Sequence, residues 1–391
     1  MEDRGEEIKS WLKEAIRRGY SDLEIRDLLN SNGYSPEEIH GVFVMKRKFK
    51  KNKLIFQKDK VKLNRFSKTS EQVPEEIREV YDLLLQTRIE VAKVIIGQKD
   101  VVDAFMCALL CDGHVLLEGV PGIAKTLLVK TLAQASGCLS HRIQFTVDLL
   151  PSDIVGITTY TPEKGFEVIK GPVFANFIIG DEINRSPPKT QSALIEAMQE
   201  KQVTIGKQTF PLPSPFFVMA NNNPLESSGV YDLPEAQVDR FLFKVIMGYP
   251  NGSEEVKIME DNMTLRKFES FDIKPILSAE KILEMQEITK KIHMDDKIKN
   301  YIVRLVEKTR KRDFDNGKYI EWGGSPRASI GIFIASKAWA LMNGRNYVIP
   351  QDVKDIAHYV LRHRIILNYK ARAEGITSDK IIDEIFAIVN I

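Results

Sequence analysis

Residues 114–126 read HVLLEGVPGIAKT, an apolar segment followed by a loop of small residues that ends in Lys125 and Thr126. The apolar segment predicts a buried strand, and the sequence after the loop, LLVKTLAQAS, predicts a helix. In this order, a strand, a loop and a helix form the setting in which backbone N–H groups surround a phosphate. The segment therefore predicts an α/β fold with a phosphate-binding loop.

The side chains of this loop indicate a nucleoside triphosphate as the ligand. Lys125 is expected to reach the β- and γ-phosphates, and the hydroxyl of Thr126 is expected to ligate Mg²⁺. Ala124 replaces the usual glycine before the lysine, which is acceptable if this residue has helical φ and ψ. The residues expected to surround the phosphates are Gly119, Val120, Pro121, Gly122, Ile123, Ala124, Lys125 and Thr126.

Two acidic residues end another apolar segment, residues 176–180 (NFIIG). A buried strand here would deliver Asp181 and Glu182 to the carboxyl edge of the sheet, where open α/β sheets bind their ligands. We expect Asp181 to hold Mg²⁺ through water and Glu182 to polarise the water that attacks the γ-phosphate. A plain surface Asp-Glu pair is the alternative, which fits poorly directly after so apolar a strand.

Three asparagines, residues 221–223, follow the apolar segment 216–220 (FFVMA) and precede Pro224. An amide at the tip of a strand beside the carboxylate strand is able to orient the attacking water or the γ-phosphate. The pattern does not decide which asparagine does so, and asparagines that only form a turn before proline are the competing interpretation.

Two arginines follow in the sequence. Arg240 closes a predicted helix in LPEAQVDRF, and Arg327 starts one in GGSPRA. Alone, each would be taken as a surface salt-bridge partner. Their order behind a phosphate loop and a carboxylate pair makes them candidates for contacts with the nucleotide.

The chain from residue 74 onward alternates apolar and helical segments, which predicts a parallel sheet covered on both faces. Residues 158–161 and 166–169 alternate around the turn PEKG and predict a β-hairpin. Residues 278–391 contain no predicted strand and are expected to form an all-helical domain. The predicted strands are 114–118, 143–147, 174–180 and 216–220, and the helices before the loop are 76–93 and 98–111.

Residues 1–45 contain a short repeat, GYSDLEI at 19–25 and GYSPEEI at 33–39. Each copy joins a glycine that ends one helix to a Ser-x-x-Glu capping box that begins the next. This predicts a small docking module resembling ubiquitin-associated three-helix domains, whereas a plain helical extension of the main body is the alternative. The three predicted helices are 5–18, 22–31 and 36–45.

The next segment is strongly basic, because residues 46–68 carry 11 Lys and Arg against one acidic residue in a chain whose net charge is only +2. Self-repulsion and weak periodicity predict a linker over 46–75. Its interleaved aromatic residues would also suit binding to nucleic acid, acidic protein or anionic membrane. A solvated linker lying on the main domain is the alternative.

Composition excludes several classes of protein. A chain of 391 residues that is 43% apolar and 28% charged is typical of a globular protein with two or three domains. It has no apolar run of the ~18 residues that a transmembrane helix needs. The N-terminus lacks the apolar core of a signal peptide, and three cysteines make no disulfide framework, which predicts a cytoplasmic location.

The run from about 94 to 364 resembles AAA+ ATPases of the MoxR family, in which alanine before the loop lysine is common. The resemblance rests on the segments GVPGIAKT, QFTVDLLPSDIVG, GPVFANFIIGDEINRSPPKTQSALIEAMQE, NNNPLESSGVYDLPEAQVDRF and GGSPRAS. It implies Lys125 and Thr126 as Walker A, Asp181 and Glu182 as Walker B, Asn223 as sensor 1, Arg240 as the arginine finger and Arg327 as sensor 2. Gln98 is expected to contact the nucleotide as well.

The resemblance further implies an architecture and an assembly. An AAA+ P-loop core over 76–275 would carry the hairpin as a helix-2 insert that points into a ring's pore, followed by a helical lid over 276–391. The ring would be a homo-oligomer, most simply a hexamer, that binds ATP and Mg²⁺. The extra spacing before Arg327 implies that it acts on a neighbouring subunit's nucleotide.

The function that the resemblance implies is ATP-driven, chaperone-like remodelling or maturation of a partner protein. The client, or a von Willebrand A-domain partner, would be a separate chain. A DNA-dependent AAA+ motor related to minichromosome-maintenance helicases is the alternative, in which the basic segment contacts nucleic acid. A scaffold that binds nucleotide without hydrolysing it is a third hypothesis.

Overall fold

The computed structural model describes residues 73–391 except 121, 164, 223–229 and 263–267. The predicted N-terminal module and nearly all of the predicted basic linker lie outside the described residues. Residues 73–391 form one compact unit. Within the described part of the chain, no helix is long and apolar enough to cross a membrane.

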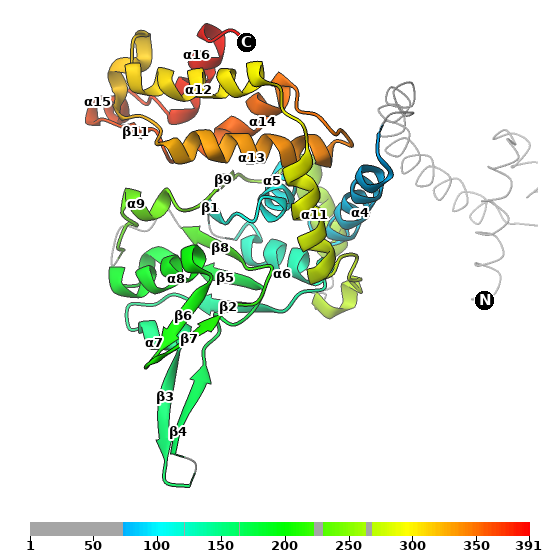
Figure 1. Ribbon diagram of the computed structural model, residues 1–391, viewed down its shortest axis with the longest axis vertical. Helices are drawn as coiled ribbons and strands as arrows, with labels where there is room; N and C mark the ends of the chain where they lie inside the picture. Colours follow the sequence, from blue (N-terminus) through cyan, green and yellow to red (C-terminus); the bar gives the residue numbers. More distant parts are fainter. Residues whose placement is uncertain (1–72, 121, 164, 223–229, 263–267) are drawn as a thin grey trace, which may run out of the picture. The chain divides into compact units, whose positions relative to one another are not determined.

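The described residues build a five-stranded parallel sheet with the order β2-β5-β8-β1-β9 (Figure 1). This confirms the predicted α/β fold with a parallel sheet. The strand that leads into the loop, β1, lies between β8 and β9. The strands are β1 (Val115–Gly119), β2 (Ser140–Gln144), β5 (Phe177–Asp181), β8 (Phe217–Asn222) and β9 (Phe243–Met247).

Helices cover both faces of the sheet. Alternate residues of each strand point to opposite sides, so apolar side chains on both faces are available to pack against helices. In β1, Leu117 packs in one core cluster with the first set of helices, and Leu116 packs in the other with the second set. The first set is α4 (Glu75–Val91), α5 (Lys99–Leu110), α6 (Lys125–Ala135) and α11 (Ala279–Lys291). The second set contains α7 (Pro151–Val155) and α8 (Pro188–Glu200), and near it lies the short α9 (Glu235–Val238).

Two β-hairpins leave the sheet on the side of α7 and α8 (Figure 1). The longer one joins β3 (Gly156–Thr161) to β4 (Gly165–Lys170) and confirms the hairpin predicted around PEKG. The shorter one joins β6 (Gln202–Ile205) to β7 (Gln208–Pro211). The remaining elements before the lid are α10 (Gly252–Asn262) and the 3₁₀ turns η1 (Ile183–Arg185) and η2 (Phe268–Phe271).

The C-terminal lid is built around α13, which packs against α12, α14 and the core helices α4 and α5. Side-chain caps start several of its helices, as where Asp295 accepts from the amide of Lys297 and Thr377 from that of Lys380. The lid helices are α12 (Asp296–Lys311), α13 (Pro326–Met342), α14 (Pro350–Leu361), α15 (Tyr369–Ala373) and α16 (Ser378–Ile388), with η3 at Asp315–Tyr319.

Three predictions about strands are wrong in detail. The strand predicted at 143–147 is β2, which runs earlier, at Ser140–Gln144. Strand β9 was missed, although it forms one edge of the sheet beside β1. The lid is not all-helical, because β10 (Ile320–Trp322) pairs antiparallel with β11 (Ile366–Leu367).

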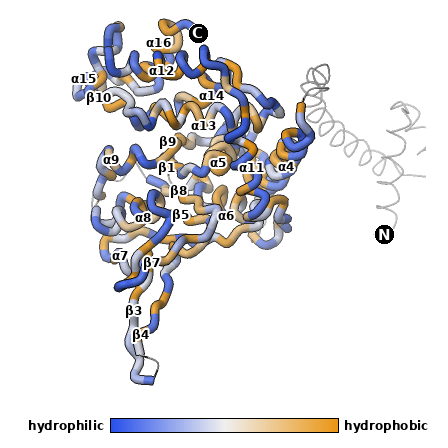
Figure 2. Tube along the Cα trace, in the orientation of Figure 1, coloured by the Kyte–Doolittle hydropathy of each residue, from blue (hydrophilic) through white to orange (hydrophobic). Residues whose placement is uncertain are grey.

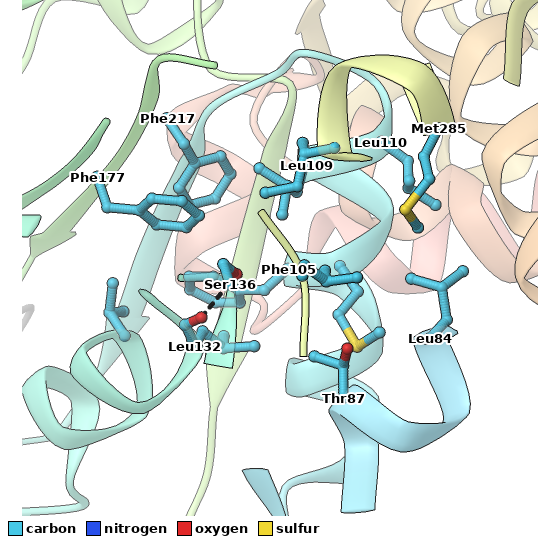
Figure 3. A pocket seen from close by; sticks show the side chains of 14 residues that line it. Leu84, Thr87, Phe105, Leu109, Leu110, Leu132, Ser136, Phe177, Phe217 and Met285 are labelled. Carbon is cyan, nitrogen blue, oxygen red and sulfur yellow. Dashed lines mark hydrogen bonds between the residues drawn. The ribbon is translucent and has the colours of Figure 1, made fainter. Parts of the chain in front are cut away.

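The interior is densely packed, and Figure 2 shows hydrophobic residues gathered around β1, β9 and α5. A cavity of about 20 Å³ remains between α4, α5, α6, α11 and the sheet. It is lined by apolar groups such as Phe177 and Phe217, whose ring centroids are 5.3 Å apart (Figure 3). Because this volume is close to that of one water molecule, the cavity is a packing defect and not a ligand site.

Candidate nucleotide-binding site

Strand β1 ends at Gly119 and helix α6 begins at Lys125, which places the loop as predicted. Gly119 packs so closely on β9 that a Cβ there would lie 2.7 Å from the carbonyl oxygen of Met247. Gly122 has a φ of +82°, which glycine adopts without strain. The close packing on β9 therefore requires glycine at 119, and the positive φ favours glycine at 122. Pro121 lies outside the described residues.

Ala124 does not have the right-handed helical φ and ψ that the sequence analysis required of it. This residue has φ of 63° and ψ of 30°, a left-handed conformation, whereas the prediction concerned helical values that alanine readily adopts. The left-handed region costs an L-residue about 1 kcal/mol relative to the right-handed one. Ala124 directly precedes α6, so the loop tolerates this strain at the point where the chain turns into the helix.

The residues predicted to bind phosphate and metal converge at the end of the loop. Lys125 is buried, and its Nζ donates a hydrogen bond of 2.7 Å to the carbonyl oxygen of Gly119. The hydroxyl of Thr126 donates to Oδ2 of Asp181 at 3.0 Å. Loop and carboxylate strand therefore meet, although 55 residues separate Thr126 from Asp181 in sequence.

Basic and amide side chains surround the carboxylates of Asp181 and Glu182. Arg142 on β2 donates from Nε to Oδ2 of Asp181 at 2.7 Å. Gln144, two residues further on the same strand, donates from Nε2 to Oε2 of Glu182 at 2.8 Å. Nε of Arg185 lies 3.2 Å from the same oxygen. Two arginines and a glutamine amide thus hold the buried carboxylate of Asp181 and the partly exposed carboxylate of Glu182.

The first of the three asparagines joins the two carboxylate residues. The side-chain amide of Asn221 donates to Oδ1 of Asp181, and its oxygen accepts from the backbone N–H of Glu182 at 2.6 Å. This amide bond supports an unusual backbone, because Glu182 has a left-handed φ of 56° and ψ of 50°. Asn223, which the resemblance assigns as sensor 1, lies outside the described residues.

The donor groups at the loop fit Mg²⁺. A hydroxyl and a carboxylate are hard oxygen ligands, and Mg²⁺ is commonly held by one or two such protein groups together with phosphates. Among the described residues, no group of three or more His, Cys, Asp and Glu side chains could hold a metal by itself. A divalent ion held by Thr126 and Asp181 would therefore take its other ligands from the nucleotide and from water.

Gln98 lies at a cleft between the sheet core and the lid. It precedes α5, and its Nε2 donates to the carbonyl oxygen of Gly248 at 2.9 Å. The cleft has a volume of about 660 Å³, within the range of small-molecule sites. It borders β9, the neighbour of β1 in the sheet. Its other lining residues include Val245, Ile246, Tyr249 and Asn251 from the core and His358, Tyr359 and Arg362 from the lid.

The structure brings Arg240 and Arg327 together at a different place. Both are exposed and line a hollow of about 280 Å³ between the end of α8 and the start of α13. Asp239, the residue before Arg240, accepts through its carboxylate from Nη1 of Arg327 at 3.3 Å. None of the described residues that line this hollow belongs to the loop at 119–126. The two arginines therefore share one hollow, which the loop of their own chain does not line.

Several residues of the site were missed from sequence. Arg142 and Gln144 lie two residues apart on β2 and therefore point to the same side of the sheet. The prediction of a strand at 143–147 left Arg142 outside the strand, so this alternation was not recognised. Tyr249 and Arg362 reach the cleft from segments far apart in the chain, and no local pattern marks either of them.

Residues 114–243 match the family model described as "ATPase family associated with various cellular activities (AAA)", and residues 312–385 match "AAA lid domain". The chain is 48% identical over 305 residues to Chaperone MoxR1 of Mycobacterium tuberculosis, covering 77% of this chain and 80% of that protein. It is 30% identical over 322 residues to Protein MoxR of Paracoccus denitrificans, covering 76% and 92%. A crystal structure of a candidate ATPase from Cytophaga hutchinsonii matches with a TM-score of 0.75 and 44% identity, covering 83% of this chain and 99% of that one.

Proposed function

Because the chain belongs to the MoxR family of AAA+ ATPases, we propose that it hydrolyses ATP to remodel or mature partner proteins as a chaperone. The observation that carries the proposal is the meeting of Thr126, Asp181, Glu182 and Asn221 at the end of the phosphate loop. The name of the relative from M. tuberculosis, a chaperone, favours remodelling over the helicase alternative.

Nucleotide binding would use two parts of the molecule. The loop backbone, Lys125 and the N-terminus of α6 would hold the phosphates. The cleft beside β9, with Gln98 and Tyr249, would take the base and sugar. Thr126 and Asp181 would hold Mg²⁺, which supplies neutralisation of phosphate charge when it is bound. Lys125 is able to exchange its bond to the Gly119 carbonyl for one to a phosphate oxygen, because ammonium donors rotate freely.

Hydrolysis would depend on Glu182. Its carboxylate would polarise the attacking water and accept its proton. In this conformation Oε2 of Glu182 accepts from Gln144 and lies beside Arg185, so the water would be met by the other carboxylate oxygen or after exchange of the Gln144 bond. Asn221 holds both the backbone of Glu182 and the carboxylate of Asp181, and would keep the base and the metal ligand at a fixed separation.

The two arginines support a ring. Arg240 and Arg327 are exposed in a hollow away from their own loop, where they are available to a nucleotide bound by a neighbouring copy. An assembly in which each subunit supplies arginines to the next closes most simply as a cyclic homo-oligomer, which we propose to be a hexamer. The three cysteines are unpaired, which suits the reducing cytoplasm proposed as its location.

Client capture tests the proposed function. The Glu182→Gln variant, loaded with ATP, would be mixed with a lysate, and the proteins retained would be compared with those retained in ADP. A client should be retained in ATP only, and purified client should stimulate the wild-type ATPase. A von Willebrand A-domain protein is one candidate for such a partner. Salt-dependent DNA binding with DNA-stimulated hydrolysis would favour the helicase alternative instead.

The tip of the β3–β4 hairpin is expected to contact the client. Tyr160 and Phe166 face each other across the hairpin with ring centroids 5.1 Å apart, and they are 63% and 79% exposed. Replacing both by alanine should leave basal hydrolysis within about twofold of wild type, because neither ring touches the loop, and abolish stimulation by client. Phosphate release with and without client measures both. Tyr369→Ala, which removes an exposed lid tyrosine, is the matched control. Normal stimulation of the hairpin variant would remove the hairpin from client contact.

The N-terminal 68 residues are expected to serve recruitment. Because residues 73–391 form a compact unit, deleting 1–68 should spare ring formation and basal ATPase but impair client capture. Size-exclusion chromatography, phosphate release and the capture experiment measure the three properties. A second variant, with the Lys and Arg of 46–68 changed to Gln, separates the basic segment from the module before it. Loss of hydrolysis on deletion would make the segment part of the motor.

A further inference from the structure

Arg364 lies where the lid meets the segment that carries Arg240. It follows α14 in the chain, and its side chain is only 4% exposed. A guanidinium has five N–H donors in a fixed planar fork, so a buried arginine needs acceptors on several sides. The acceptors of its five donors therefore show which parts of the chain Arg364 holds together.

All five donors of Arg364 have acceptors, and four of these acceptors belong to residues 239–242. Nε donates to the carboxylate of Asp239 at 2.8 Å, and the Nη groups donate to three backbone carbonyls of this segment. These carbonyl oxygens are those of Asp239 (3.0 Å), Phe241 (2.8 Å) and Leu242 (3.1 Å), and the fifth is that of Val360 within the lid (2.6 Å).

The bonds to Arg364 hold the carbonyl groups of the segment 239–242, which lies between the end of α9 at Val238 and the start of β9 at Phe243. The backbone amides of the same residues donate to other backbone carbonyls, so Arg364 adds to the turn bonds of the segment. The carbonyl oxygen of Phe241 also accepts from Nε2 of His363 at 3.0 Å. Burial lowers the pKa of His363 well below its usual value, so the ring is neutral and this nitrogen carries the proton. His363 and Arg364, two successive lid residues, thus donate hydrogen bonds to backbone carbonyls on both sides of Arg240.

The same carboxylate reaches Arg327. Asp239 accepts from Arg364 through Oδ1, and through Oδ2 it accepts from Nη1 of Arg327 at 3.3 Å and from the hydroxyl of Ser325 at 3.4 Å. Arg240 is the next residue in the chain. One buried lid arginine is therefore connected to both exposed arginines, to Arg240 through the backbone of its neighbours and to Arg327 through a shared carboxylate.

The lid segment that carries Arg364 also borders the cleft of its own subunit. Arg362 lines this cleft and donates from Nη1 to the carbonyl oxygen of Lys244 on β9 at 3.0 Å. Two residues later, Arg364 bonds the chain just before that strand. A lid movement that follows nucleotide binding in the cleft would therefore move the arginines offered to the next subunit.

We propose that Arg364 is a positioning residue for ATP hydrolysis, which holds Arg240 and Arg327 in register for the nucleotide of the neighbouring subunit. The inference rests on the proposed function of these two arginines. All five donors of Arg364 are bonded to protein acceptors, so none is left for a phosphate in this arrangement. Its effect should appear in the turnover of the adjacent site and not in nucleotide binding by its own subunit.

Arg364→Lys is the first test, because lysine keeps the charge and loses the five-donor fork. We expect kcat to fall about tenfold or more, while the dissociation constant of a fluorescent ATP analogue stays within about twofold. Arg345→Lys is the matched control. Arg345 also forms a two-bond pair with a buried carboxylate, Asp352, but this pair lies inside the lid. A fall in kcat that is equal in both variants would overturn the proposal.

Mixed rings decide in which subunit Arg364 acts. Glu182→Gln subunits cannot hydrolyse but offer intact arginines, whereas Arg364→Lys subunits keep an intact loop. Mixing them should restore hydrolysis above either variant alone, and mixing Arg240→Ala with Glu182→Gln should do the same. If only the Arg240→Ala mixture recovers, the role of Arg364 is refuted while the proposed ring mechanism stands. If the Arg240→Ala mixture also fails, the ring mechanism is refuted, and this inference with it.

Asp239→Asn provides a second route if Arg364→Lys does not fold, as judged by its thermal unfolding and its ring assembly. Asparagine keeps one acceptor oxygen and removes the charge shared by the two arginines. We expect a smaller loss of kcat than for Arg364→Lys, with the same recovery in rings mixed with Glu182→Gln. Wild-type turnover in Asp239→Asn would overturn the proposal.

Discussion

Arg240→Ala is expected to abolish most ATP hydrolysis while leaving ATP binding intact. Negative charge builds up on the γ-phosphate as it is transferred, and an arginine that stabilises it from a neighbouring subunit contributes roughly 10³–10⁵ in rate. Arg240 is exposed beside a hollow that contains no described residue of the loop, so its removal should not disturb the loop of its own chain. Phosphate release measures the loss, and titration with a fluorescent ATP analogue measures binding.

Two further variants make the result specific to the guanidinium of Arg240. Arg240→Lys should recover little activity, because an ammonium group cannot reproduce the planar fork. Arg372→Ala removes an exposed arginine of α15 that lines neither the loop nor the hollow, and it should behave as wild type. If Arg240→Ala turned over at the wild-type rate, Arg240 would have no role as an arginine finger.

Glu182→Gln should stop turnover after ATP has bound and before it is hydrolysed, and the bound ATP should stabilise the ring. An amide cannot accept the proton of the attacking water, and loss of a general base costs roughly 10²–10⁴ in rate. The substitution is nearly isosteric, and Asn221 bonds the backbone at residue 182 and not its side chain, so the local structure should survive. Retained nucleotide, phosphate release and size-exclusion chromatography in ATP measure the three expected properties.

The control for this variant is Glu287→Gln in α11. Glu287 is exposed and pairs only with the neighbouring Lys290 among its described contacts, so both turnover and ring size should be unchanged. Unchanged turnover in Glu182→Gln would exclude Glu182 as the group that activates water. Lost turnover together with lost nucleotide binding would instead indicate damage to the loop.

The elements predicted best are those in which local pattern and local chemistry agree. Strand, loop and helix around residues 114–126 were placed nearly to the residue, because the glycine loop ends the strand and starts the helix within a short segment. The β3–β4 hairpin was also predicted, since period-2 alternation on both sides of a turn needs no distant partner. Fold and phosphate loop could thus be predicted without knowledge of any long-range contact.

The errors fall where distant partners decide the structure. Strand β2 is an edge strand, so its outward residues are polar, and the prediction followed the apolar Phe145 and Val147 past the end of the strand. Strands β10 and β11 span three and two residues, too few for any periodicity, and only their mutual pairing orders them. The left-handed Ala124 was missed because closure of the loop against the sheet, and not the propensity of alanine, sets its φ.

The sequence by itself determined which groups are candidates for the chemistry of this protein, because the loop motif, the strand that ends in Asp181 and Glu182, and the arginines are each contained in a few consecutive residues. Only the tertiary structure decided which of these groups act together. It joins Thr126 to Asp181, uses Asn221 to hold both carboxylate residues, and places Arg240, Arg327 and Arg364 around one hollow. Hydrogen bonds act over about 3 Å in space whatever the separation in sequence, so these partnerships follow from packing and not from local pattern.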